Sequence, residues 1–185
     1  LATEYPEWSC VGFDKTPTFP QTIRPSNTEF LSGNILNGLP FPDDTFDFVQ
    51  MRAFIMVFTK ENWTQALKEI HRVLKPGGWI QLLEPEWDLT PHTFLIVKNL
   101  MEESGVDPYV CERLPAMLTE TNFNVMQEER RSVRLKSIEA CRPFLNGLYN
   151  FQSEQDFEFW KAQYTKAQKD TSEAVWYAAA AQKPL

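Results

Sequence analysis

Two short apolar runs near the start of the chain end in side chains that could bind a ligand. Asp14 and Lys15 close the first run, and Asn34 and Ile35 follow the second. A carboxylate at the carboxyl end of a parallel strand can accept hydrogen bonds from both hydroxyls of a ribose. An asparagine amide oxygen can accept from a ligand amino group. The residues alone also fit a solvated turn acid, an exposed lysine and a turn-stabilising asparagine, so both interpretations stay open.

Two later apolar runs end in the same way. The third ends at Met51 and Arg52, and the fourth ends at Glu84, with Glu86 two residues further on. Arg52 could pair with a ligand carboxylate or lie on the surface. Glu84 or Glu86 could orient a substrate, or take its proton if burial raised the carboxyl pKa. Acids in such positions more often cap a helix or lie in a loop, and His92, near the same edge, is a weaker candidate.

Residues 39–84 predict the elements that position these side chains. Thr59 is a candidate N-cap for a helix that the Pro-Gly-Gly motif at residues 76–78 would end. The apolar positions between them recur at the spacing of one helix face, and they are Trp63, Ala66, Leu67, Ile70, Val73 and Leu74. Two short apolar runs joined by a helix indicate parallel strands with a right-handed crossover. Ligands of such sheets bind beyond the carboxyl ends of the strands.

The rest of the chain predicts the other elements of an α/β domain. Strands are expected at residues 9–14, 28–32, 46–51, 79–83 and 123–135. Helices are expected at residues 91–103, from Pro115 to about 122, at 138–148 and at 154–169. The many charges along residues 123–135 favour an edge position or a solvated face for this strand. Residues 174–181 are ambiguous, because the alanines favour a helix while Val175, Trp176 and Tyr177 favour a strand.

Two segments, LPFPDDTFDFVQMR and HRVLKPGGWIQLLE, carry a family resemblance. In order and spacing they resemble the second half of a class I S-adenosyl-methionine-dependent methyltransferase, of the small-molecule kind called methyltransferase type 11. The resemblance covers residues 1–135 and returns at the C-terminus. It implies an α/β fold with a doubly wound, mostly parallel Rossmann-like sheet, in which residues 174–181 form a strand beside the fourth strand. It also implies S-adenosyl-L-methionine as the cofactor and a small molecule as the methyl acceptor.

The resemblance implies a role for each of the first strand-end residues. Asp14 would hold the ribose of the cofactor, and the stem of Lys15 would cover the edge of the adenine. The family usually has an acid where this sequence has Asn34, whose amide oxygen would accept from the adenine amino group without the charge. Ile35 would lie against the flat face of the adenine.

The resemblance places the third strand end beside the methionine part of the cofactor. Met51 would line this part, and Arg52 would meet its carboxylate. Methyl transfer from a sulfonium needs mainly positioning and the removal of water, so no catalytic residue is named. Residues 53–58 and the helices expected within residues 138–169 would cover the acceptor, and their aromatic content indicates an apolar one.

The glycine-rich turn G-x-G-x-G is absent from this sequence, although the family uses it to approach the cofactor closely. The family pattern places this turn, and the central strand before it, just upstream of Leu1. The chain is therefore expected to be a single N-terminally truncated methyltransferase domain, residues 1–185, with a helical insertion at about 138–170. Without the central strand two strand edges lose their partners, and weak cofactor binding is expected.

Two other functions compete with the enzyme. A non-catalytic pseudo-enzyme or interaction module would keep the fold without the cofactor, which the missing turn favours and Asp14 opposes. A nicotinamide dehydrogenase on a similar sheet is a weaker alternative, because it also needs the glycine turn. A strand and glycine turn in frame in the upstream genomic sequence would support the enzyme.

Composition and charge disfavour several kinds of partner. The net charge of −7 and the lack of basic runs disfavour nucleic acid. No apolar stretch of the sequence is as long as a membrane span. Cys10, Cys111 and Cys141 are scattered and have no metal-ligand spacing, so no metal is expected. Free cysteines, with no recognisable signal peptide, favour the cytoplasm.

Overall fold

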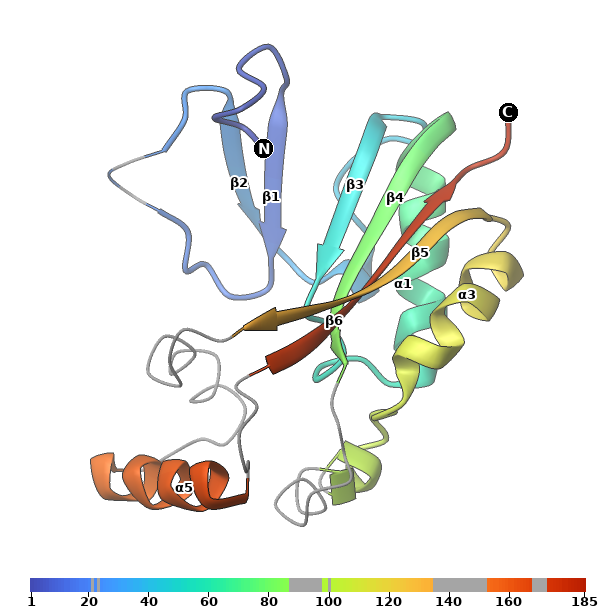
Figure 1. Cartoon of the computed structure of the whole chain (residues 1–185). Coiled ribbons are helices and arrows are strands. Elements are labelled where there is room, and N and C mark those ends of the chain that lie inside the picture. The colour runs from blue at the N-terminus through green and yellow to red at the C-terminus, as the bar shows by residue number, and fades with distance from the viewer. Residues whose placement is uncertain (21, 23, 87–97, 100, 135–152, 168–172) are drawn as a thin grey trace.

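The computed structural model describes residues 1–20, 22, 24–86, 98–99, 101–134, 153–167 and 173–185. In chain order the elements are β1 (Cys10–Asp14), β2 (Thr28–Ser32), the 3-10 helix η1 (Ile35–Asn37), β3 (Phe46–Arg52), α1 (Lys60–Val73), β4 (Leu74–Glu86), α3 (Val110–Glu120), β5 (Asn124–Arg134), α5 (Glu154–Ala167) and β6 (Glu173–Gln182) (Figure 1). Residues 98–99 and 101–103 are also helical, whereas the helix expected at 138–148 lies outside the described residues. The predicted α/β class is confirmed.

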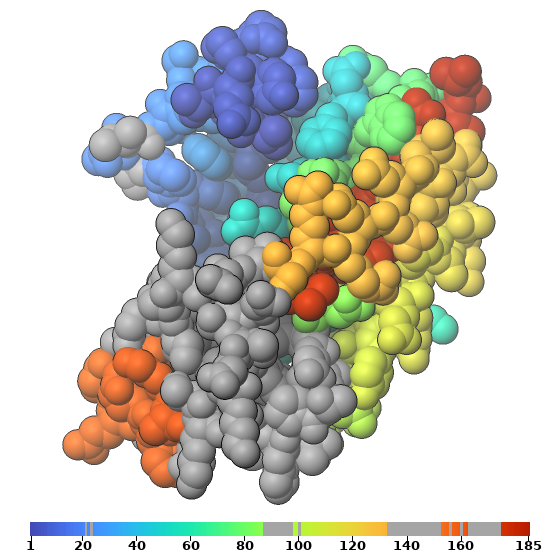
Figure 2. All heavy atoms as spheres, in the orientation of Figure 1, coloured from blue at the N-terminus to red at the C-terminus, as the bar shows by residue number. Residues whose placement is uncertain are grey.

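The strands of the described residues form two separate sheets. β1 and β2 pair in parallel, and the larger sheet has the order β3-β4-β6-β5. β3 and β4 are parallel, while β6 runs antiparallel to both of its neighbours. The predicted place of the C-terminal strand beside β4 is confirmed. So is the edge position of β5, which lies along the surface in gold in Figure 2.

Capping and an apolar face explain why α1 forms. The Thr59 hydroxyl accepts from the Asn62 N–H at 3.3 Å, and the Asn62 side-chain oxygen accepts from the Thr59 N–H at 3.2 Å. This reciprocal cap binds an N–H group that the first turn would otherwise leave unpaired. The predicted apolar face is confirmed, because the buried residues of the helix are Trp63, Ala66, Leu67, Ile70 and Val73.

The chain leaves α1 sooner than the Pro-Gly-Gly motif at residues 76–78 predicts. β4 begins at Leu74, so the motif lies inside a strand and not in a separate turn. Its extra residues form an irregularity opposite Phe46 and Phe48, where the pairing register shifts. Gly77 has a φ of 77°, a left-handed backbone conformation that glycine adopts without strain.

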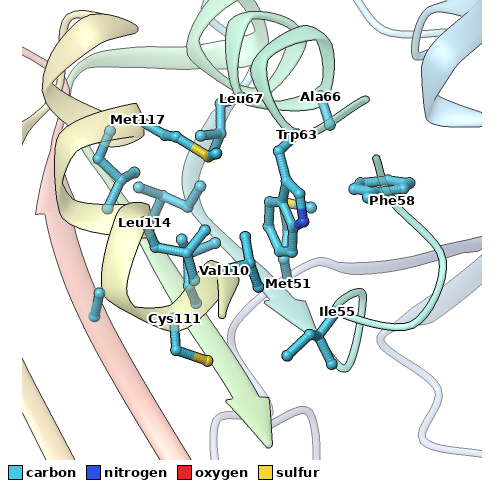
Figure 3. Close-up of a cluster of buried hydrophobic side chains, with 14 of the residues drawn as sticks. Met51, Ile55, Phe58, Trp63, Ala66, Leu67, Val110, Cys111, Leu114 and Met117 are labelled. Atoms are coloured by element: carbon cyan, nitrogen blue, oxygen red, sulfur yellow. The ribbon is translucent and has the colours of Figure 1, made fainter. Parts of the chain in front are cut away.

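The hydrophobic core lies between α1, α3 and one face of the larger sheet. Figure 3 shows Trp63 and Leu67 of α1 on the side that faces Leu114 and Met117 of α3. The sheet contributes alternate residues of β4 and β6, each at most 1% exposed: Ile80, Leu82, Ala179 and Ala181. This packing fixes the position of β4 and, through the ladder, of β3.

The start of α3 differs from the prediction. The helix begins at Val110, and Pro115 lies inside it instead of opening it. Val110, Cys111 and Leu114 are at most 2% exposed, so the packing of the first turns outweighs the N–H bond that the proline cannot make. Asn122, just after the helix, has a φ of 68°, a left-handed conformation that commonly ends a helix.

Candidate functional site

The ends of β1 and β2 bring two of the predicted residues together. Asp14 pairs with Ser32 in the parallel register, and the Gly33 N–H donates to the Asp14 carbonyl at 2.9 Å. Asn34 follows directly. The Asp14 side chain is exposed, and its Oδ1 accepts from the Thr16 N–H at 2.8 Å. An exposed carboxylate therefore stands at the carboxyl end of β1, beside the turn that leads to Asn34.

The residues next to this carboxylate have structural roles of their own. The Oδ1 atom of Asn34 caps η1 by accepting from the Leu36 N–H at 3.0 Å, which uses one of its two lone pairs. Ile35 is half-buried and packs against the hydrophobic core. Lys15 is exposed, and its carbonyl accepts from the Ser32 hydroxyl at 3.4 Å. Contacts of these three residues with an adenine stay predictions.

Side chains of α1 hold η1 and the loop after it against this helix. Gln65 Nε2 donates to the Leu36 carbonyl at 2.7 Å. Glu69 Oε1 accepts from the Leu39 N–H at 2.6 Å, and the Arg72 guanidinium donates to the Leu39 carbonyl at 3.1 Å. Arg72 also pairs with Glu69 at 2.6 Å and holds the pKa of that carboxyl below its usual value. These contacts connect the segment after β2 to α1.

Met51 and Arg52 end β3 in different surroundings. The side chain of Met51 is 3% exposed and lies in the core cluster with Trp63 (Figure 3), so it could line a ligand only through its main chain. Arg52 is exposed, and its guanidinium lies 5.8 Å from the centre of the Trp176 ring, within the range of a cation–π contact. Arg52 therefore lies at the strand end as predicted, and its pairing with a cofactor carboxylate stays a prediction.

Glu84 is a buried carboxylate at the end of β4. It is 0% exposed, and its Oε1 and Oε2 atoms accept from the N–H groups of Phe54 and Ile55 at 3.1 and 2.8 Å. Burial raises the pKa of Glu84 to about 7, against the opposing effect of these N–H groups. The sequence allowed a group that orients the substrate or takes its proton, or a capping or loop residue, but hydrogen bonds from main-chain N–H groups were not predicted. The signal was an acid that directly follows an apolar strand.

Glu86 belongs to a network with β5 and β6. Both of its carboxylate oxygens lie within 3.0 Å of Arg130 Nε. The Arg130 guanidinium lies 5.0 Å from the centre of the Tyr177 ring, and the Tyr177 hydroxyl donates to Glu128 at 3.0 Å. Burial raises the pKa of Tyr177. Because these groups bind one another, the network joins strands and does not present Glu86 as a base.

The described residues contain neither a metal-binding cluster nor a membrane-spanning helix. In the part of the chain that the structure describes, no group of three or more His, Cys, Asp or Glu side chains is arranged to hold a metal ion. Cys10 and Cys111 are free thiols, and burial raises the pKa of Cys111 to about 12. None of the described helices is both long and apolar enough to cross a membrane. His92 and Cys141 lie outside the described residues.

Comparison with solved structures identifies the class of fold. A S-adenosyl-methionine-dependent methyltransferase of Methanosarcina mazei superposes on this chain with a TM-score of 0.60. The match covers 95% of this chain and 82% of that chain, at 18% sequence identity. A likeness at such low identity shows the fold alone. The predicted Rossmann-like methyltransferase fold is therefore confirmed.

Comparison of sequences finds methyltransferase relatives over the first part of the chain. Residues 1–82 match the family model described as a methyltransferase domain. The N-methyltransferase verN of Clonostachys rogersoniana is 39% identical over 83 residues, which are 43% of this chain and 29% of that protein. A demethylmenaquinone methyltransferase of Lysinibacillus sphaericus is 42% identical over 74 residues, which are 40% of this chain and 28% of that protein. The resemblance to the S-adenosyl-methionine-dependent methyltransferases is thereby confirmed, and the match spans less than a third of either relative.

Proposed function

We propose that this chain forms part of a S-adenosyl-L-methionine-dependent methyltransferase and holds the adenosyl half of the cofactor. One observation carries the proposal. The exposed carboxylate of Asp14 stands at the carboxyl end of β1, and the Gly33 N–H bonds this strand end to the turn at Asn34. An acid in this place can accept two hydrogen bonds from the ribose hydroxyls, and its charge strengthens both.

The other cofactor contacts follow from the same edge. β1 and β3 point the same way in Figure 1, so their carboxyl ends lie on one side of the molecule. The free lone pair of the Asn34 amide oxygen and the side chain of Ile35 would receive the adenine, with the stem of Lys15 at its edge. The main chain of Met51 and the guanidinium of Arg52 would receive the methionine part.

The binding of the cofactor by this chain alone is expected to be weak. The sequence contains no G-x-G-x-G turn. Among the described residues, β1 and β3 also have a ladder partner on one side only. The two halves of the proposed site are therefore connected by loops and not by a continuous sheet. We expect an affinity weaker than micromolar.

The acceptor is proposed to be a small, largely apolar molecule. Two of the curated relatives carry the names of an N-methyltransferase and a demethylmenaquinone methyltransferase. Of the predicted acceptor cover, Ile55 and Phe58 are at most 3% exposed and belong to the core, whereas Val57 is 65% exposed. Apolar surface therefore remains at this end of β3. The expected absence of a nucleic-acid partner and the cytoplasmic location stay predictions from composition.

Titration of the chain with S-adenosyl-L-methionine, followed by calorimetry or ligand-observed NMR, tests the proposal. Asp14→Asn keeps the shape of the side chain and removes its charge. We expect at least a tenfold loss of affinity, because hydrogen bonds to a charged group are worth about 1.5–3 kcal/mol each. Asp43→Asn is the matched control, because Asp43 is exposed and pairs with Arg72 on the loop before β3.

Each outcome of this titration has a clear meaning. Equal affinity of the wild type and the Asp14→Asn variant would remove Asp14 from the cofactor site. Micromolar affinity of the wild type would contradict the expected weak binding. No binding at millimolar concentration would favour a second candidate, a non-catalytic interaction module, which the division into two sheets also favours.

A further inference from the structure

Glu84 is an unusual carboxylate, because it is fully buried and its hydrogen-bond partners are main-chain groups. Its Oε1 accepts from the Phe54 N–H at 3.1 Å, and its Oε2 accepts from the Ile55 N–H at 2.8 Å. A buried charge needs hydrogen bonds to be tolerated, and here two successive N–H groups supply them. The carboxylate therefore acts on the turn at residues 53–55, some 30 positions earlier in the chain.

This turn needs support from outside. Ala53 has a φ of 62°, in the left-handed region that residues with a Cβ atom rarely adopt. The Ala53 N–H donates to the Leu83 carbonyl at 3.0 Å, one residue before Glu84. Three successive N–H groups, those of residues 53, 54 and 55, are thus held by the end of β4.

We propose that Glu84 is a positioning residue that fixes this turn at the carboxyl end of β3. By holding Phe54 and Ile55, its carboxylate sets the place of Arg52, which directly precedes the turn. The consequence for the cofactor rests on the proposed function, because Arg52 is the residue expected to meet the methionine carboxylate. The fixation of the turn does not depend on that function.

The alternative role of Glu84, as a proton acceptor for the substrate, does not fit this geometry. Each oxygen already accepts an N–H, and the side chain has no exposed surface. The other acid of this strand, Glu86, is bound by Arg130 at 2.9 Å. Neither carboxylate is therefore directed at a methyl-accepting substrate. Glu84 instead acts through the turn at residues 53–55.

The Phe54 and Ile55 N–H groups each need an acceptor oxygen, and the two oxygens of the Glu84 carboxylate supply both. A carboxamide presents its NH2 group to one of the two donors, so one hydrogen bond is replaced by a repulsive contact between donors. Glu84→Gln therefore removes one of the two hydrogen bonds while it keeps the volume of the side chain nearly unchanged. The ionisable groups that face Glu84 from the neighbouring strands and helix are Glu86 of β4, Arg130 of β5, Tyr177 of β6 and Cys111 of α3.

Amide hydrogen exchange of the full chain tests the proposal. In the Glu84→Gln variant we expect the Phe54 and Ile55 amides to exchange at least tenfold faster than in the wild type. Amides inside α1, such as that of Ile70, should keep their rates. Glu86→Gln is the matched control: it removes one charge from the same strand and should leave residues 54 and 55 unchanged.

A titration of the same variants with S-adenosyl-L-methionine adds a readout that a merely structural role would not move. We expect Glu84→Gln to lose at least threefold in affinity while its resistance to urea at pH 8 is retained. Unchanged exchange at residues 54 and 55 would overturn the proposal, whatever the titration gives. If the wild type itself does not bind, the proposed function fails, while the exchange rates still decide the role of Glu84.

A second variant covers the case in which Glu84→Gln does not fold. Glu84→Asp keeps the charge but is one methylene shorter, so it can reach only one of the two donors. We then expect faster exchange at one of the two amides, Phe54 or Ile55. Full protection of both amides in this variant would also overturn the proposal.

Discussion

The two parallel strand pairs of this chain share a hydrogen-bond pattern but differ in packing. Every residue of β1 and β2 is half-buried or exposed. In contrast, Leu74, Ile80 and Leu82 of β4 are 0% exposed against the helices. Because a ladder hydrogen bond largely replaces one made to water, the burial of apolar surface decides the stability of a pair. The β1–β2 pair therefore depends on its connections to the rest of the molecule.

This difference divides the candidate site. Asp14, Lys15 and Asn34 belong to the thinly packed pair or follow it, whereas Met51 and Arg52 end a strand that the core holds. Segments with few buried apolar contacts open at a low cost in free energy. The adenosyl half of the proposed site is therefore the part that a cofactor would have to order, and ordering lowers the observed affinity.

The largest expected effect comes from a matched pair of truncations. Leu67→Ala, in α1, removes a 0% exposed side chain and should lower the free energy of unfolding by about 3 kcal/mol. Leu31→Ala, in β2, truncates a half-buried side chain and should cost about 1 kcal/mol or less. Urea denaturation of both variants measures the difference. Equal losses would show that the β1–β2 pair is as well packed as the larger sheet.

The sequence predicted the packed region well because its signals are local. A capping threonine at position 59 and apolar residues at helical spacing located α1, and both features lie within one element. The place of β6 beside β4 needed the family resemblance, because Val175, Trp176 and Tyr177 compete with neighbouring alanines in propensity. Pro115 misled the prediction of α3, because burial of the turn before it outweighs the local rule.

The candidate site was predicted less completely, for a physical reason. Strand ends located Asp14 and Arg52, since the end of an apolar run is visible in sequence. The partners of Glu84 are main-chain N–H groups of residues 54 and 55, and a main-chain group leaves no residue type to recognise. Asn34 likewise accepts from a main-chain group, the N–H of Leu36. An asparagine is common both in turns and in ligand sites, so the residue type alone could not distinguish the two roles.

The second prediction concerns the cost of a buried charge in the packed region. Glu84 has a pKa of about 7 in the folded chain, against the ordinary value of 4.5. Its raised pKa contributes stability that is fully present below pH 4.5 and is lost as the pH rises through 7. A shift of this size corresponds to up to about 3 kcal/mol. Between pH 8 and pH 4.5, the free energy of unfolding of the wild type should therefore rise by about 3 kcal/mol relative to that of the Glu84→Gln variant.

Urea denaturation of both proteins across this pH range measures the difference. Comparison with the Gln variant cancels the titration of all other groups that the two proteins share. Because burial is the first cause of the shift, the slope should lie between pH 4.5 and 7. A difference between the two proteins that does not vary with pH would show that Glu84 is solvated in the folded chain.

The third prediction concerns the side chain that ties the C-terminus to the packed sheet. Lys183 Nζ donates to Asp44 Oδ1 at 2.7 Å and to the carbonyls of His71 and Leu74 at 2.9 and 2.7 Å. Its side chain is 13% exposed. Lys183→Met should cost about 2 kcal/mol, because it leaves these acceptors without their charged donor.

A surface pair provides the control for this variant. Lys75 bonds to Asp47 at 2.7 Å, but the two side chains are 45% and 84% exposed. Lys75→Met should therefore change the free energy of unfolding by less than about 0.5 kcal/mol. Similar losses in both lysine variants would mean that burial does not strengthen the contacts of Lys183.

The smallest effect is expected at the corresponding tie in the thinly packed region. Asn27 Nδ2 donates to the carbonyls of Ala2, Tyr5 and Trp8 at 3.1, 3.1 and 2.8 Å. Two amide protons are shared among three acceptors that water can also reach, so each bond is weaker than those of Lys183. Asn27→Ala should change the free energy of unfolding by about 0.5 kcal/mol or less, since replacement by water recovers most of the loss. Hydrogen exchange should nevertheless become faster in residues 1–14 and remain unchanged in α1, because this region opens separately from the core. A loss as large as that of Lys183→Met would show instead that the two strand pairs unfold as one unit.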